Sequence, residues 1–162
     1  MTEEEVKKLK NYAVWLLSRQ EYSTSGLRQK LQQKGASTAV AEELLQWLQS
    51  LDYLNDDRYA ESYLNRQVAK GLGEKRVLLD AKQKGVSRET LQQLIAEQQI
   101  DWYTQAANTY QKKYGICATK LEYKEKTKRV RYMSYRGFSF DEIEFAIDTA
   151  INAAEQEAIK GE

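Results

Sequence analysis

Apolar side chains recur along most of the chain at the spacing of an amphipathic helix. They fall at Val6, Leu9, Ala13 and Leu16 in the first segment, and residues 41–51 repeat the pattern with alanine and leucine. A spacing of three to four residues places such side chains on one face of a helix. The chain also contains no proline, so no backbone position forbids a helix. The pattern therefore predicts an all-α protein.

A short motif that occurs three times predicts the corner between two helices. Tetrapeptides with Gly second and Ser fourth stand at 34–37, 84–87 and 136–139, at nearly equal intervals. Glycine just beyond a helix adopts the left-handed backbone conformation without a Cβ penalty, and a serine two residues later can cap the next helix. The predicted turn and cap residues are Gly35, Ser37, Gly85, Ser87, Gly137 and Ser139.

Each corner joins a basic second helix to a third helix, and a longer first helix precedes them. Cap signals at Ser23, at Asn55 or Asp56, and at Asp101 set the other helix starts. The result is three helix-turn-helix-like units of three helices each, expected at residues 1–55, 56–100 and 101–162. Units of this size cannot bury a full hydrophobic face alone. We therefore expect them to stack into one continuous structural unit, an elongated and curved array of tandem repeats.

The composition narrows the chemistry that the chain can perform. It has no histidine and one cysteine, Cys117, so neither a Ser-His nor a Cys-His nucleophile pair can form. A transition-metal site would have to rely on carboxylates and one thiol, and no Gly-rich phosphate loop has a standard spacing. We expect a protein that works by binding, without catalytic residues, metal or cofactor. A carboxylate-pair enzyme around Asp56 and Asp57 is a weaker hypothesis, because acids are favoured at helix starts.

The same features bear on where the protein works. No stretch approaches the roughly 18 apolar residues of a membrane span, and the first residues do not resemble a signal peptide. A single cysteine agrees with a reducing compartment. We expect a cytoplasmic protein that does not associate with membranes.

Charge is segregated along the chain although its formal net value is only +1. The three second helices carry an excess of Lys and Arg, and the three third helices an excess of Asp and Glu. Helix dipoles favour this arrangement at Lys34, Lys84 and Arg136 near helix ends, but disfavour the cations near a helix start at Lys124, Lys126 and Lys128. Two interpretations stay open: helix dipoles combined with solubility, or a basic surface for DNA phosphates or an acidic protein.

The candidate binding residues, chosen by charge and placement, are Arg28, Lys30, Arg66, Lys70, Lys75, Arg76, Lys124, Lys128, Arg129, Arg131 and Arg136. If Arg129 and Arg131 both face solvent, reversing their charges together should weaken binding and leave helical content intact. Sequence-specific DNA recognition is disfavoured, because the third helix would have to enter the major groove and it is acidic in all three copies.

Several stretches in a fixed order resemble a known family over nearly the whole chain. They are Glu21-Tyr22-Ser23 with Leu27-Arg28-Gln29-Lys30-Leu31, then Tyr53-Leu54-Asn55-Asp56-Asp57-Arg58-Tyr59-Ala60, Lys70-Gly71-Leu72-Gly73, Gln83-Lys84-Gly85-Val86-Ser87-Arg88, Ile100-Asp101-Trp102, Lys113-Tyr114-Gly115 and Tyr135-Arg136-Gly137-Phe138-Ser139. In these the chain resembles the RecX family of regulators of the RecA recombinase.

The resemblance implies three repeats of three helices and a non-catalytic modulator of RecA. Such a protein would bind in the groove of the RecA–single-stranded DNA filament and restrain its ATPase, strand-exchange and co-protease activities. A role in homologous recombination, DNA repair and the SOS response would follow. The implied partners are the RecA filament and single-stranded DNA, with double-stranded DNA as a further ligand, and we expect a monomer. The alternative is a stand-alone, non-specific DNA-binding protein that acts through the basic second helices.

Overall fold

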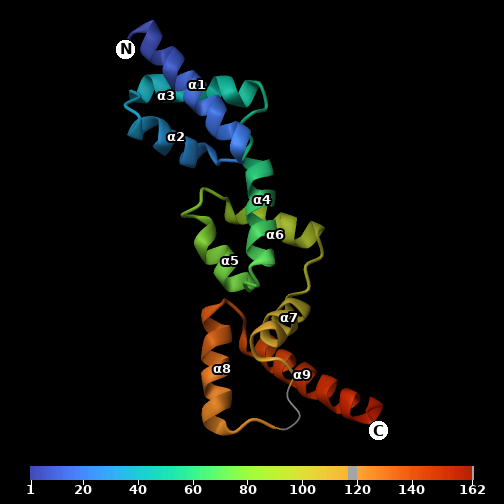
Figure 1. The fold of residues 1–162 in the computed structure, drawn as a ribbon. Helices are drawn as coiled ribbons and strands as arrows, with labels where there is room; N and C mark the ends of the chain where they lie inside the picture. Colours follow the sequence, from blue (N-terminus) through green and yellow to red (C-terminus); the bar gives the residue numbers. More distant parts are fainter. Residues whose placement is uncertain (117–119, 162) are drawn as a thin grey trace. The chain divides into compact units, whose positions relative to one another are not determined.

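The computed structural model describes residues 1–116 and 120–161, and every regular element within them is an α-helix (Figure 1). The helices are α1 (Glu3–Arg19), α2 (Thr24–Gln33), α3 (Thr38–Ser50), α4 (Asp56–Ala69), α5 (Glu74–Ala81), α6 (Arg88–Glu97), α7 (Trp102–Tyr114), α8 (Tyr123–Tyr135) and α9 (Phe140–Lys160). The all-α prediction is confirmed. Across the described ranges, no helix is long and apolar enough to cross a membrane. Cys117 lies outside the described residues.

The chain divides into two compact units, and the second predicted repeat contributes to both. The first unit comprises Met1–Tyr63 and Ala81–Leu94, and the second comprises Leu64–Asp80 and Ile95–Glu162. The repeat bounds at residues 55 and 100, and the elongated, curved stacking of the repeats, stay predictions.

Each unit has its own apolar core. In the first unit, α2 packs on α1 and α3, and Leu27, Leu31 and Leu48 are fully buried. In the second unit, α7 lies along α9 and α8 packs beside α9, around the fully buried Tyr110 and Met133. Each such side chain contributes about 1.5–3 kcal/mol when it is removed from water. Packing of the predicted apolar faces, rather than helix propensity alone, therefore holds the helices of each unit together.

The three glycine corners have the predicted geometry. The φ angles of Gly35, Gly85 and Gly137 are 94°, 74° and 103°. In each corner the N–H of the next residue returns to a carbonyl of the preceding helix, as in Phe138 to Met133 at 3.2 Å, which is the Schellman arrangement. The serines that follow cap the third helices by accepting the N–H groups of Val40, Thr90 and Glu142. Glu142 also accepts the N–H of Ser139, which completes the capping box.

Two of the corners also pack against the start of a second helix. In the first unit, Gly85 lies so close to Ser23 and Ser25 that a Cβ would overlap their hydroxyls. In the second unit, the backbone of Gly137 lies against Gly73 and Arg76. Gly73 is the residue before α5 and has no side chain to cap that helix. Instead its N–H donates to the Arg136 carbonyl at 2.8 Å, and the N–H of Lys75 donates to the Gly137 carbonyl at 3.2 Å. The α8–α9 corner thereby satisfies donors that a helix start would otherwise leave free.

The cap of α7 gives a pH-dependent prediction. Asp101 accepts hydrogen bonds from the Thr104 hydroxyl at 2.8 Å and from the backbone N–H groups of Thr104 and Tyr103. The Thr104 hydroxyl first, and then these N–H groups, hold the pKa of Asp101 below its ordinary value of 3.8. A carboxylate whose pKa is lowered by folding stabilises the fold above its unfolded pKa, and this contribution disappears as the pH falls through the folded pKa.

We therefore expect Asp101→Ala to melt at a lower temperature than the wild type at pH 7, and the difference to shrink below about pH 3.8. Circular dichroism melts over a pH series measure this. Asp101→Asn is the control, because its amide oxygen caps at every pH. Equal melting temperatures for Asp101→Ala and the wild type at pH 7 would contradict the cap.

Candidate functional site

The eleven candidate cations lie on four helices or directly after them. Arg28 and Lys30 belong to α2, and Arg66 to the last turn of α4, which Lys70 follows. Lys75 and Arg76 lie in the first turn of α5. The other five lie on α8 or at its C-cap: Lys124, Lys128, Arg129, Arg131 and Arg136. Arg28 and Lys30 belong to the first unit and the other nine to the second. Some of the eleven have a structural partner within their unit, and others face solvent.

Arg28 is engaged by the third helix of its own repeat. Its Nε donates to Glu42 Oε1 at 2.6 Å and a second nitrogen reaches Oε2 at 3.3 Å. This bidentate hydrogen bond raises the pKa of Arg28 and lowers the pKa of Glu42. Lys126 on α8 also pairs with an acid of the third helix, Glu144 on α9, at 3.1 Å. Part of the charge segregation between second and third helices therefore has a cause that neither sequence interpretation named: ion pairs within a repeat.

Arg76 and Arg136 hold the α5 start and the α4 end against α8. Arg76 donates to Asp80 at 3.0 Å and to the Tyr135 carbonyl at 3.1 Å. Arg136 donates to the carbonyls of Lys70 and Gly71, just beyond the end of α4. Buried or half-buried helix ends need such partners. Both arginines thus have a structural role in the second unit, whatever else they bind.

Arg129 does not face solvent, contrary to the condition set for its reversal together with Arg131. Its side chain is 15% exposed and pairs with Glu125 at 2.9 Å. It also donates to the hydroxyl of Tyr110 at 2.8 Å, and its guanidinium lies 4.5 Å from the centre of the Tyr114 ring. The periodicity of α8 could have shown this, because Val130 and Met133 place the core-facing side of the helix next to position 129.

The remaining exposed candidates share a different environment. Their side chains are exposed and, within the described ranges, form no ion pair or hydrogen bond: Lys30, Lys70, Lys75, Lys124, Lys128 and Arg131. Five of the six are lysines, whereas the engaged candidates are arginines. The arginines are engaged because the forked guanidinium suits carboxylates and carbonyls. The lysines face solvent because an ammonium group is more strongly hydrated.

Three of these residues form what we call the α8 stripe: Lys124, Lys128 and Arg131. They are four and then three residues apart, so they lie on one face of α8. Like charges at this spacing destabilise a helix by about 0.2–0.5 kcal/mol per pair, and Lys124 lies in the first turn, where the helix dipole disfavours a cation. Within the described residues, none of the three side chains forms an ion pair with an acidic residue. A local cost of this kind favours a binding surface over a purely structural one.

The structure adds two cations that the sequence reasoning did not select. Lys112 and Lys113, in the last turn of α7, line a hollow of the second unit together with Lys70 and Arg136. In the sequence, their place at the end of an apolar pattern indicates only a favourable interaction with the helix dipole. No sequence signal shows that α4, α7 and α8 bring these four cations to one hollow.

The acidic side chains that the structure describes do not gather into a metal site. Across the described residues, no group of three or more Cys, Asp or Glu side chains is placed to hold a metal ion. The weaker hypothesis placed a carboxylate-pair enzyme near Asp56, but the polar residues there bond to the backbone at helix starts. Asp56 accepts the N–H of Thr24 at 2.7 Å, and Asn55 caps α4 by accepting the N–H of Arg58.

The helices, corners and exposed cations define an all-α protein made of tandem three-helix units. Comparison with known families identifies the family. Models of the first, second and third three-helix domains of RecX match residues 10–48, 55–95 and 99–147. The chain belongs to the RecX family.

Individual relatives agree with this. A regulatory protein RecX from Vibrio parahaemolyticus is 39% identical over 139 residues, covering 85% of this chain and 88% of the relative. One from Haemophilus influenzae is 40% identical over 133 residues, covering 82% and 88%. The crystal structure of RecX from Lactobacillus salivarius matches with a TM-score of 0.71 at 22% identity, covering 96% of this chain and 99% of that one. At that identity the structure supports the fold alone.

Proposed function

We propose that the chain is a non-catalytic regulator of the RecA recombinase. It would bind in the groove of the RecA–single-stranded DNA filament and restrain the ATPase, strand-exchange and co-protease activities of RecA. The observation that carries the proposal is membership of the RecX family, whose curated relatives are named regulatory proteins and are matched over most of their length. The α8 stripe supports it, because it offers exposed cations that form no ion pair with the described residues.

The test is a titration of the full chain against the single-stranded-DNA-dependent ATPase of RecA. We expect the ATPase rate to fall as the chain approaches stoichiometry with the filament. Co-sedimentation with RecA filaments, with and without DNA, separates binding to the filament from competition for the DNA. An unchanged ATPase rate together with no co-sedimentation would overturn the proposal.

The α8 stripe gives a sharper form of this test. Reversing Lys128 and Arg131 to glutamate should weaken co-sedimentation by about tenfold or more, because two exposed cations become anions on the face that we assign to the partner. The melting temperature should stay near the wild-type value, since both side chains are exposed and without an ion-pair partner in the described chain. Lys7→Glu with Lys8→Glu on α1 makes the same change in net charge. Equal loss of binding in the control would mean that the affinity for the filament depends on the net charge of the chain and not on this face of α8.

The second candidate function, stand-alone binding of DNA through the second helices, draws on the same exposed lysines. It requires affinity for DNA without RecA, and a plot of log affinity against log salt with a slope of about 0.7–0.9 per phosphate contact. A flat salt response would remove it.

A further inference from the structure

We infer that the hollow between α4, α7 and α8 in the second unit is a binding site for a phosphate group, carried by a nucleic acid strand or a nucleotide. We call it the phosphate pocket. It is formed by residues outside the α8 stripe, and its occupation does not depend on the proposed contact with RecA. The inference rests on the charge of its lining, the absence of acidic residues from that lining and the kind of donors it contains.

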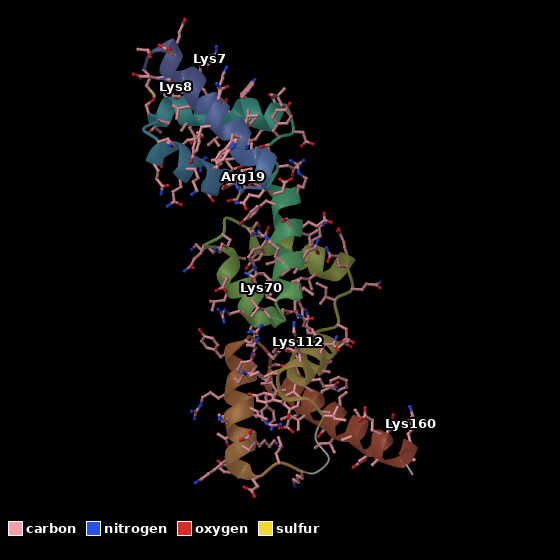
Figure 2. The ribbon with its side chains drawn as sticks, viewed as in Figure 1. Lys7, Lys8, Arg19, Lys70, Lys112 and Lys160 are labelled. Atoms are coloured by element: carbon pink, nitrogen blue, oxygen red, sulfur yellow. The ribbon has the colours of Figure 1, made fainter. Side chains whose placement is uncertain are left out.

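The phosphate pocket has a volume of about 370 Å³, and its cationic lining comes from three helices. Lys70 follows the last residue of α4, Lys112 and Lys113 lie in the last turn of α7, and Arg136 is the C-cap of α8. Figure 2 shows Lys70 and Lys112, the two labelled members, both in the second unit. No aspartate or glutamate is among the lining residues.

Helix dipoles alone do not account for this charge. The C-terminal ends of α4, α7 and α8 each carry the equivalent of about half a negative charge, whereas the pocket has four full positive charges. The cations therefore exceed the dipoles by more than two elementary charges. Arg136 bonds to the uncharged carbonyls of Lys70 and Gly71, and Lys113 lies over the Tyr132 ring at 5.3 Å, so neither is neutralised by an anion. An anionic ligand would complete the site.

The donors favour phosphate over the carboxylate of a partner protein. The forked guanidinium of Arg136 suits carboxylate and phosphate alike, and it already holds the end of α4, so it does not distinguish the two. The remaining donors are ammonium groups with a nearby amide, Asn108, and lysine and asparagine are typical donors to nucleic acid phosphates. The centres of protein interfaces are instead depleted in lysine and enriched in aromatic residues. Lys70, Lys112 and Asn108 are all exposed, so an incoming strand can reach them.

The experiment measures binding of a labelled oligothymidylate to the full chain in the absence of RecA. We expect Lys112→Gln with Lys113→Gln to raise the dissociation constant about tenfold at low salt, and to lower the log–log salt slope by about 0.7 for each phosphate that the variant no longer neutralises. Glutamine favours helix almost as well as lysine, so α7 should persist. The matched control is Lys7→Gln with Lys8→Gln, which removes the same charge from exposed positions of α1 in the first unit. A control that binds as weakly as the pocket variant would overturn the inference.

Competition and resonance mapping locate the ligand and identify its source. ATP that displaces the oligonucleotide and shifts the amide resonances of Asn108 and Thr109 would assign the pocket to nucleotides. Shifts with the oligonucleotide alone would assign it to the strand. Shifts confined to other residues, displacement by polyglutamate as effective as by ATP, or no binding of either phosphate compound would each overturn the phosphate pocket. RecA is absent from all of these measurements. The phosphate pocket can therefore be refuted while the ATPase titration supports the proposed function, and the proposed function can be refuted while the pocket is supported.

Discussion

Gly137→Ala is expected to lower the free energy of unfolding by about 2–6 kcal/mol, the sum of strain and overpacking. The φ angle of Gly137 is 103°, in a region that residues with a Cβ rarely adopt, and strain of this kind costs about 1–3 kcal/mol. An added Cβ would also overlap the backbone nitrogen and Cβ of Arg76. Overpacking of this kind costs about 1–3 kcal/mol more, and a backbone cannot turn aside as a flexible side chain can. The two costs add, because one is local conformation and the other is contact between two elements.

Gly35→Ala is the matched control for this prediction. Gly35 occupies the same position in the first corner, with a φ of 94°, but a Cβ there meets nothing within 4 Å. The control should therefore lose only the conformational part, about 1–3 kcal/mol. Urea denaturation followed by circular dichroism measures both variants. Equal losses would show that the contact between the α8–α9 corner and the α5 start adds no stability.

The contrast between these two glycines shows how far the sequence predicts the fold. The three corners and their caps could be predicted because each depends on residues adjacent in sequence: a glycine with positive φ and a serine that bonds to an N–H three residues later. The contact of Gly137 with Arg76 could not, because the same tetrapeptide pattern occurs at 34–37 without any such contact. Whether a corner is packed depends on which element reaches it through space.

The candidate site shows the same division. Net charge of a segment predicts a cationic helix, and α8 is one, but it does not say which cations face solvent. Arg28 and Lys126 are held by acids of the third helix, at Glu42 and Glu144, and these pairings join residues 14 and 18 positions apart. Periodicity along α8 could have set Arg129 apart from Arg131. The phosphate pocket could not have been predicted, because its cations come together only through the packing of α4, α7 and α8.

Arg129→Glu is expected to destabilise the second unit by about 2–3 kcal/mol, somewhat less than the loss of a fully buried pair. The change places a carboxylate next to Glu125, removes the donor to the hydroxyl of the fully buried Tyr110, and loses the guanidinium over the Tyr114 ring. Breaking a buried pair costs about 3–5 kcal/mol. The expected value is lower because Glu125 is 44% exposed and can turn toward water.

Arg131→Glu, two residues further along the same helix, separates stability from binding. Arg131 is exposed, so its reversal should change the free energy of unfolding by no more than about 0.5 kcal/mol. Urea titrations of the two single variants measure the difference, and co-sedimentation with RecA filaments is compared at a temperature where both are folded. We expect the less stable variant, Arg129→Glu, to keep more of its binding, and the stable one, Arg131→Glu, to lose more. If Arg129→Glu were as stable as Arg131→Glu, the contacts of Arg129 with Glu125 and Tyr110 would contribute nothing to the fold, and the division of these arginines into structural and binding residues would be wrong.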